Sequence, residues 1–301
     1  LNKSRINSKQ ILGIGTSAIG PCVLPIDAKG KPLRPGILYG IDTRATKEID
    51  YLESVLGKQE IFRMSGTHLN SQASGPKILW IRNNEPHIYE QSRWFLTSQA
   101  YLVYKLTGVP SIDIYSASGY APLFDIYKFG WYEEVASQIT PIDRLPQAYW
   151  SCEIVGEVTA EAAKETGLAA GTPVIAGTID AAAEAISAGV AEFGDMMLMF
   201  GSSIFFIMKT AELHKTQHFW SANFLERGAF AFMGGMSTSG SLTTWFRDRF
   251  AQKEVEREKS GGENAYAVLA REAAGSSTGA NGLVALPYFE GERTPLHDPK
   301  A

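Results

Sequence analysis

The hydrophobic and polar positions of this 301-residue chain follow two patterns, strand-like runs and helical spacing, which succeed one another along its length. Residues 11–40 predict short strands joined by a tight turn at residues 27–30, whose Asp-Ala-Lys-Gly sequence suits a turn. Residues 43–57 predict an amphipathic helix that ends at Gly57. The apolar face of this helix is expected to carry Ile49, Leu52, Val55 and Leu56.

Further helices are predicted where capping residues flank a helical pattern. Helical segments cover residues 76–91 and the stretch from Thr97 to Gly108. Thr97 is a suitable N-cap because its hydroxyl can accept a free backbone N–H, and Gly108 is a suitable stop. A short helix is predicted between Thr159 and Gly167 for the same reasons.

The second half of the chain is richer in strand-like runs. Three of them lie in residues 195–234, and helical patterns follow at 239–250 and 263–275. The apolar run at 282–289 predicts one more strand.

The alternation of strands and helices on both sides of residues 171–177 favours the α/β class. We place a domain boundary in this stretch, which gives domains 1–173 and 174–301. Hydrophobic residues make up 45% of the chain and charged residues 20%, a composition typical of folded globular domains rather than disordered segments.

Charge and cysteine content narrow the function classes. A net charge of −4 argues against a nucleic-acid or anionic-membrane surface, and no apolar run has the length of a membrane span. Cys22 and Cys152 lie far apart without CxxC spacing, which argues against a disulfide framework or a zinc site and favours a cytoplasmic protein. The polar first ten residues do not have the pattern of a signal peptide.

Two short motifs are weak evidence for the binding sites that their spacing suggests. Residues 13–18, GIGTSA, have the GxGxxA spacing of a dinucleotide-binding turn, but Pro21 and a hairpin pattern follow where that turn needs a helix. His214 and His218 have the spacing of metal ligands on a helix, yet no further ligand type stands beside them. We therefore expect a solvated loop there and no metal site formed by side chains.

Asp180 stands alone at the junction of an apolar run and a helix. Residues 174–176 predict a buried strand, Gly177 and Thr178 follow, and the alanines at 181–183 open the helix. The carboxylate suits a helix N-terminus as a simple cap. The small side chains around it would also let a substrate approach, so a general base at the floor of a cleft is the other interpretation.

Two glycine- and serine-rich segments interrupt the strand-like runs of the second half. Gly201, Ser202 and Ser203 predict either a hairpin or β-bulge, or a turn whose amides and hydroxyls hold a phosphate. Residues 233–246 lead into a predicted helix whose free N–H groups could bind an anion. Two such loops in one domain favour phosphate binding.

Five segments together resemble the FGGY carbohydrate kinases, and the xylulokinase-like members most. They are PKILWIRNNEP (76–86), GTIDAAAEAISAGV (177–190), MFGSSIFF (199–206), SGSLTTWFRD (239–248) and ALPYFEGERTPLHDPKA (285–301). The resemblance covers essentially the whole chain. It implies an actin-like, ribonuclease-H-like fold of two α/β domains, incomplete at both termini, whose cleft binds a sugar on one side and ATP with Mg²⁺ on the other.

The resemblance also implies roles for individual residues. Asp180 matches the family's base, which takes the proton from the attacking sugar hydroxyl. The nucleotide and phosphate side is expected to comprise Gly201, Ser202, Ser203, Gly240 and Thr244. The sugar side is expected to comprise Asp180 with Ala18, Ile19, Asp42 and Arg44. Closure about residues 171–178 would exclude water from the cleft.

Two departures from the family pattern are visible. Ala18 and Ile19 stand where xylulokinases have Met and His, so one family sugar contact is missing. Segments resembling the family's first phosphate loop and adenine-binding loop are absent, so the chain resembles the middle of a longer kinase and is expected to be inactive alone.

The expected activity is ATP-dependent phosphorylation of a sugar or polyol hydroxyl, with a pentulose such as xylulose as substrate. The alternative is a non-catalytic, actin-like binding or assembly module. No nucleic-acid or membrane partner is expected, whereas uncovered strand edges favour a homodimer or low solubility.

Overall fold

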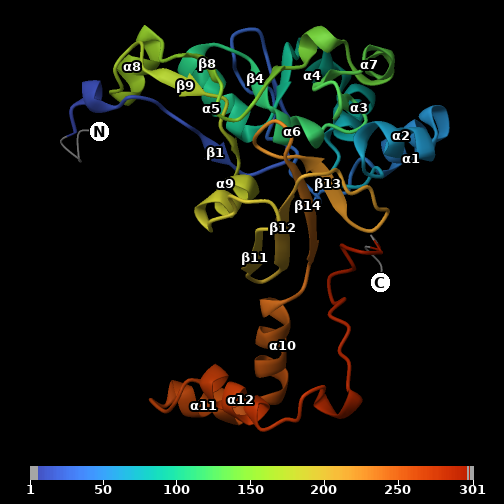
Figure 1. Cartoon of the computed structure of the whole chain (residues 1–301), viewed down its shortest axis with the longest axis vertical. Coiled ribbons are helices and arrows are strands. Elements are labelled where there is room, and N and C mark those ends of the chain that lie inside the picture. The colour runs from blue at the N-terminus through green and yellow to red at the C-terminus, as the bar shows by residue number, and fades with distance from the viewer. Residues whose placement is uncertain (1–5, 297, 299–301) are drawn as a thin grey trace. The chain divides into compact units, whose positions relative to one another are not determined.

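The computed structural model describes residues 6–296 and residue 298 (Figure 1). It divides into two compact units. The first comprises the chain up to Met197 together with Ile207–Phe232, and the second comprises Leu198–Phe206 and the chain from Met233 onward. The expected boundary between domains 1–173 and 174–301 concerns the family's domains and stays a prediction.

A four-stranded sheet takes its strands from residues 196–236, so the strand-like runs predicted in this region are confirmed. The strand order is β11–β12–β14–β13. The strands are β11 (Met196–Phe200), β12 (Ile204–Thr210), β13 (Trp220–Asn223) and β14 (Phe230–Met236). The division between the two units falls within β11, β12 and β14.

The remaining strands are short and pair two by two within the first unit. The parallel pairs are β1 (Ser17–Ala18) with β10 (Thr178–Ile179), and β4 (Ser111–Asp113) with β7 (Gln147–Tyr149). The antiparallel pairs are β2 (Leu24–Ile26) with β3 (Trp94–Leu96), β5 (Phe124–Asp125) with β6 (Gly130–Trp131), and β8 (Ile154–Glu157) with β9 (Pro173–Ile175).

Helices alternate with these strands, which confirms the α/β class. They are α1 (Thr46–Leu56), α2 (Lys58–Ser65), α3 (Ser74–Asn84), α4 (Pro86–Gln91), α5 (Ser98–Thr107), α6 (Ile114–Ser118), α7 (Glu133–Ile139), α8 (Ala160–Thr166) and α9 (Asp180–Ser187). Single 3₁₀ turns lie at Ser8–Gln10 and Ile142–Arg144. The GxGxxA motif ends in the short strand β1 and is followed by a turn at Pro21 rather than by a helix, so it does not form a dinucleotide-binding turn.

The predicted helix ends are confirmed where capping is local. The Thr97 hydroxyl accepts the N–H of Ala100 at the start of α5, and Gly108 ends that helix in the left-handed region. Thr159 caps α8 in the same way, and Gly167 ends it. These four positions follow from hydrogen bonds within one turn of chain, which is why the sequence alone predicts them.

Helix α1 is amphipathic as predicted, and Ile49 and Leu56 pack against the core beside Leu52. Leu52 is fully buried, whereas Val55 is 50% exposed. Glu48 takes an inward position instead, because its carboxylate accepts a hydrogen bond from the amide of Asn83 on α3 (3.2 Å). The polar contact across the helix pair thus decides which positions of α1 face the core.

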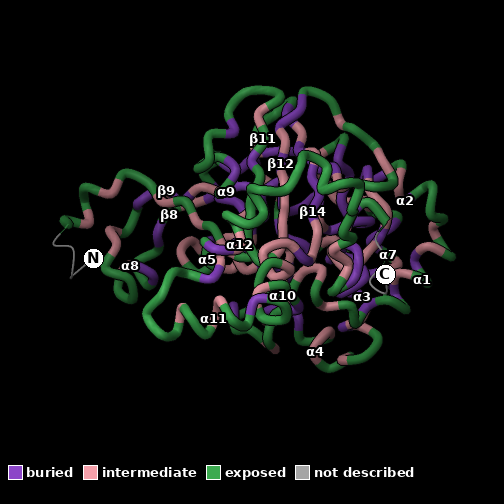
Figure 2. Tube along the Cα trace, turned by 90° about the horizontal axis from the view of Figure 1, so that it is seen from below, coloured by how far each residue is buried: buried purple, intermediate pink, exposed green. Residues whose placement is uncertain are grey.

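The second unit contains the adjoining parts of β11, β12 and β14 with helices α10 (Gly240–Phe250), α11 (Gln252–Lys259) and α12 (Ala265–Ala274). No residue of α10 or α11 is buried (Figure 2). The strand predicted at 282–289 is wrong, since this segment pairs with no strand among the described residues. Leu283 and Val284 are more than four-fifths exposed, so an apolar run without a neighbour to bond to did not become a strand.

The described residues, 6–296 and 298, contain no helix with the length and apolarity needed to cross a membrane. Within the same ranges, no group of three or more His, Cys, Asp or Glu side chains is placed to hold a metal ion.

Candidate functional site

Asp180 is the first residue of α9 and directly follows β10. Its Oδ1 accepts the N–H of Ala181 (2.8 Å), and its carboxylate also accepts the backbone N–H of Gly20. The N-cap position belongs to Ile179, and no side chain makes a capping bond there. Asp180 is therefore not the N-cap residue, although its carboxylate satisfies one N–H of the first turn and also accepts an N–H from the neighbouring segment.

The candidate sugar-side residues Ala18 and Ile19 lie beside Asp180. The parallel pairing of β1 with β10 places Ala18 opposite Ile179, one residue before the carboxylate. Gly20 makes this approach possible, since a Cβ there would lie 2.5 Å from Cγ2 of Ile179. The side chain of Ile19 remains 40% exposed. Residues 17–20 and the turn at Asp180 therefore form one continuous candidate surface for substrate binding.

Burial raises the pKa of Asp180 above its usual range, because the half-buried carboxylate loses contact with water. Hydrogen bonds from the backbone N–H groups of Ala181 and Gly20 oppose that shift but do not outweigh it. A raised pKa increases the proton affinity of the carboxylate, which is the property a general base needs.

The turn before Asp180 is held by several segments of the first unit. The N–H of Gly177 donates to the Ser151 carbonyl (2.9 Å), and the Thr178 hydroxyl donates to Oδ2 of Asp113 (3.0 Å). Gly177 has a φ of +68°, and a Cβ there would lie 2.3 Å from the Thr16 carbonyl oxygen. Only glycine fits this backbone and this space.

Asp113 is a site residue that the sequence analysis missed. It lies at the end of β4, is fully buried, and caps α6 by accepting the N–H of Ser116 (3.1 Å). Its other oxygen, Oδ1, has no hydrogen-bond partner among the residues that the structure describes. The signal available in the sequence was one acid within the apolar run Ile112–Tyr115.

We expect Asp113→Asn to flatten part of the pH dependence of folding stability. Burial raises the pKa of Asp113 from 3.8 to about 6. Between these values the native state binds more protons than the unfolded chain, so stability falls as the pH rises through this window. The shift corresponds to about 3 kcal/mol. Urea unfolding between pH 4 and 7 measures the effect, with the exposed Asp50→Asn as control. Equal slopes for Asp113→Asn and the wild type would contradict it.

Asp42 and Arg44 form an ion pair in the loop before α1. Arg44 Nη2 lies 2.8 Å from Oδ2 of Asp42, and its guanidinium lies over the Trp80 ring, 4.8 Å from the centroid. Burial alone would raise the pKa of Asp42, but the Arg44 hydrogen bonds and the charges of Arg44 and Lys77 outweigh burial and lower it. The predicted pair is therefore brought together, with the carboxylate held ionised.

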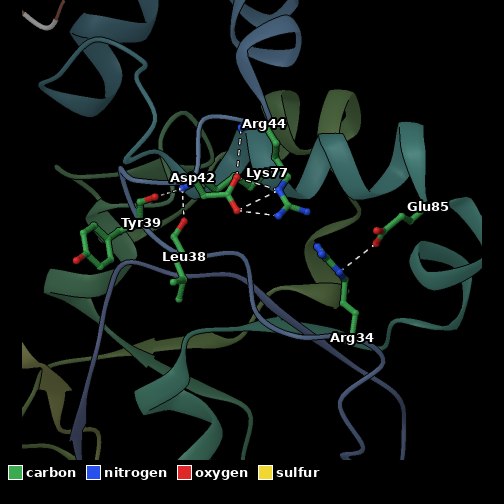
Figure 3. Close-up of polar contacts among 7 residues, drawn as sticks. All are labelled: Arg34, Leu38, Tyr39, Asp42, Arg44, Lys77 and Glu85. Carbon is green, nitrogen blue, oxygen red and sulfur yellow. Dashed lines mark hydrogen bonds and ion pairs between the residues drawn. The ribbon is translucent and has the colours of Figure 1, made fainter. Parts of the chain in front are cut away.

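Lys77 on α3 is the second residue that the sequence analysis left unassigned (Figure 3). Its Nζ donates to the carbonyls of Leu38 (2.6 Å) and Tyr39 (3.1 Å) in the loop that carries Asp42. The signal in the sequence was a lysine between proline and an apolar triplet in PKILW.

Cys22 lies within electrostatic range of both parts of the candidate sugar side. Its thiol interacts with the charges of Lys77 and Asp180, and burial raises its pKa. Its Sγ also donates to the carbonyl of Ile19 (3.7 Å). Lys77 and Asp180 are therefore close to the same thiol within the first unit.

In the second unit the two predicted phosphate loops lie against each other. The carbonyl of Gly201 accepts the N–H of Gly240 (2.9 Å). The carbonyl of Ser202 accepts the N–H groups of Ser239 (2.8 Å) and Ser241 (3.2 Å). A Cβ on Gly240 would lie 2.5 Å from the Gly201 oxygen, so glycine is needed for this contact.

The same bonds correct one expectation about α10. Its N-terminal N–H groups were expected to be free for an anion, but those of residues 239–241 donate to the neighbouring loop. The hydroxyls of Thr243 and Thr244 donate to the carbonyl of Gly240, and Thr244 also bonds the Tyr266 hydroxyl (2.9 Å). Ser202 is exposed beside this helix start.

The sequence matches a known family over nearly its whole length. Residues 1–187 match the FGGY family of carbohydrate kinases, N-terminal domain, and residues 196–301 match the C-terminal domain of the same family. The chain belongs to this family. The resemblance on which the sequence analysis relied is thereby confirmed.

Two relatives of this FGGY family member are similar over most of its length. The xylulose kinase of Bacillus subtilis (strain 168) is 28% identical over 300 residues, which cover 98% of this chain and 57% of the relative. The gluconokinase of the same organism is 28% identical over 296 residues, 97% of this chain and 57% of the relative. The chain thus spans little more than half the length of these relatives.

Solved structures agree with the expected fold. The xylulose kinase from Rhodospirillum rubrum superimposes with a TM-score of 0.87 at 30% identity, over 96% of this chain and 57% of that one. The Plasmodium falciparum glycerol kinase with ADP gives a TM-score of 0.76 at 21% identity, over 96% of this chain and 56% of that one, and shows the fold alone. The sugar kinase fold is confirmed.

Proposed function

We propose that the protein containing this chain transfers a phosphoryl group from ATP to a hydroxyl of a sugar or polyol, with Asp180 as the general base. The observation that supports this most is the placement of Asp180. A half-buried carboxylate of raised pKa lies beside Ala18 and Ile19 at the end of a parallel strand pair. Family membership supplies the class of reaction.

The residues of the first unit would act by positioning the sugar and moving one proton. Asp180 would accept the proton of the attacking hydroxyl, which increases the nucleophilicity of that oxygen. Asp42 and Arg44 would hydrogen-bond the sugar hydroxyls from the loop before α1. Because phosphoryl transfer depends mostly on positioning and charge stabilisation, this set covers the sugar half of the chemistry.

The two small-residue loops of the second unit contain residue types that bind phosphate groups. Gly201, Ser202 and Ser203 form a turn of small residues, Gly240 lies against it, and the Thr244 hydroxyl donates to the Gly240 carbonyl. The hydroxyls of Ser202 and Ser203 are suitable donors to phosphate oxygens, whereas the N–H groups of Gly201 and of residues 239–241 already donate to carbonyls of these loops. When bound, Mg²⁺ would neutralise phosphate charge, and it would be held mainly by the nucleotide.

The proposed substrate class is a pentulose such as xylulose. The names of the relatives support it, since they include xylulose kinase as well as gluconokinase. Ile19 presents an exposed apolar side chain where xylulokinases have histidine, so preference among sugars is set differently here. Closure about residues 171–178, a cytoplasmic location and a homodimer stay predictions.

A substrate panel tests the proposal. ADP release by the complete protein is measured with ATP, Mg²⁺ and each of xylulose, ribulose, gluconate and glycerol, and kcat/KM ratios rank the sugars. We expect release that depends on a sugar. Sugar binding without turnover in the complete protein would favour the alternative, a non-catalytic binding or assembly module. The 301-residue chain alone is expected to show no turnover.

We expect Gly240→Ala to weaken nucleotide binding in the complete protein. The new Cβ would lie 2.5 Å from the Gly201 carbonyl oxygen, so the two loops must separate. Overpacking of this kind costs about 1–3 kcal/mol, and if that cost falls on the nucleotide-bound state, the KM for ATP rises about 5- to 150-fold. The KM for the sugar should stay unchanged. Gly275→Ala, with φ of −78°, is the matched control, and equal KM values for the two variants would contradict this role.

A further inference from the structure

We infer that Lys77 is a positioning residue for the sugar-side loop, residues 38–44, and that its ammonium group holds this loop in the shape that presents Asp42 and Arg44. The inference rests on the proposed function, because it assigns these two residues to the sugar. It adds a residue that the family's phosphate and base motifs do not include.

Lys77 is too deeply buried to touch a substrate itself. Only 1% of its surface is exposed, although it carries a charge on a helix whose neighbouring residues Ile78 and Leu79 are also buried. A buried ammonium is costly unless it is hydrogen-bonded and faces negative charge. Any effect of Lys77 on the sugar must therefore act through the residues that its Nζ contacts.

Nζ of Lys77 makes hydrogen bonds to the sugar-side loop. It donates to the carbonyl oxygens of Leu38 (2.6 Å) and Tyr39 (3.1 Å). The Tyr39 carbonyl also accepts the N–H of Asp42 (2.9 Å), so one oxygen joins Lys77 to the turn that carries Asp42. In Figure 3 the side chains of Asp42 and Arg44 pair directly beside this turn.

A second anchor supports the same loop from the segment just before α3. The N–H of Gly40 donates to Oε1 of Gln72 (3.1 Å), and a Cβ on Gly40 would lie 2.7 Å from Nε2 of Gln72. Ile41, which directly follows these anchored residues, is 69% exposed. The loop is therefore fixed at residues 38–40 and exposed at Ile41, and fixed supporting contacts are what a substrate-binding loop needs.

Burial and the charges around Lys77 have opposing effects on its pKa. Burial lowers its pKa to about 8, the charges of Asp42 and Cys22 raise it, and that of Arg44 lowers it further. As the pH rises through this value, Lys77 loses its charge, and Arg44 remains as the other cation that lowers the pKa of Asp42. The hydrogen bonds to the two carbonyls weaken at the same time, because charged donors make stronger bonds.

The test compares Lys77→Met and Lys77→Gln with Lys164→Met in the complete protein. Lys164 is an exposed lysine on α8 and serves as the matched control. Loss of charge-assisted hydrogen bonds should raise the KM for the sugar about tenfold or more in Lys77→Met. The kcat and the KM for ATP should change by less than about twofold, a division between constants that general destabilisation would not produce.

The pH profile supplies a second readout. In the wild type the KM for the sugar should rise above about pH 8, and this rise should be absent in Lys77→Gln, which keeps its N–H donors but has no charge to lose. A fall in kcat at unchanged KM, or the same alkaline rise in Lys77→Gln, would overturn the inference. Should Lys77→Met fail to fold, Lys77→Gln decides by the same measurements.

Hydrogen exchange separates this inference from the proposed function. If the wild type phosphorylates no sugar, the proposed function fails, and exchange of the Asp42 amide still tests the loop anchor. Lys77→Met should speed that exchange about tenfold relative to Lys164→Met, because the Tyr39 carbonyl loses its second donor and the turn opens more often. Equal exchange in both variants would overturn the inference whatever the activity.

Discussion

Asp180→Asn should lower the turnover of the complete protein by about two to four orders of magnitude, the usual contribution of a general base. Asparagine has the same shape and keeps an oxygen that can accept the N–H of Ala181, so α9 should start as before. The amide cannot take a proton from the attacking hydroxyl. Steady-state kinetics should therefore show a large fall in kcat and little change in the KM for the sugar.

Stability and pH profiles complete this experiment. Urea unfolding should show a small effect compared with the kinetic one, and Asp50→Asn, an exposed acid on α1, should leave kcat unchanged. The acid limb of kcat/KM in the wild type should lie above the usual range of an aspartate, because burial raises the pKa of Asp180. Near-normal turnover in Asp180→Asn would remove this residue from the mechanism.

Gly177→Ala should destabilise the protein by about 3–5 kcal/mol. A side chain at φ of +68° is strained by about 1–2 kcal/mol, and the new Cβ would lie 2.3 Å from the Thr16 carbonyl oxygen. Relief would require β1 and β10 to separate, which would also displace Asp180. Urea unfolding measures the loss of stability, and the activity of the folded fraction measures the displacement.

Gly189→Ala is the matched control for this variant. Gly189 has a φ of +97°, but a Cβ there would meet nothing within 4 Å. It should cost only the backbone strain, about 1–2 kcal/mol. Because the two variants share a left-handed backbone and differ in the space around it, their difference measures the close packing beside Asp180. Equal losses would mean that this packing relaxes easily.

Local features of the fold were predictable from the sequence because their causes are local. Thr97 and Thr159 accept N–H groups three residues ahead, and Gly108 and Gly167 end their helices through their own backbone freedom. The segment at 282–289 has an equally clear apolar pattern, yet it lacks a partner strand among the described residues. A strand depends on hydrogen bonds to another segment, so its pattern alone did not decide the outcome.

The residues of the candidate site also differ in whether local sequence could predict them. Asp180 was predictable because a lone acid between an apolar run and an alanine-rich helix is unusual within one short segment. Asp113 and Lys77 were not, because an acid or a lysine in an apolar run has no meaning until its partner is known. Those partners, Thr178 and the carbonyls of Leu38 and Tyr39, lie 38–65 residues away in the chain.

The sequence by itself determined the family, the α/β class, the carboxylate at the start of α9 and the two small-residue loops at 201–203 and 239–241. Each of these is written in a few neighbouring residues, whose spacing and size limit what the backbone can do. Only the tertiary structure decided that the two loops bond to each other, that Asp180 accepts the N–H of Gly20 besides that of its own first turn, and that Lys77 supports the loop of Asp42. Those contacts join segments far apart in the chain, and burial gives them their strength by removing the water that would otherwise compete for every hydrogen bond.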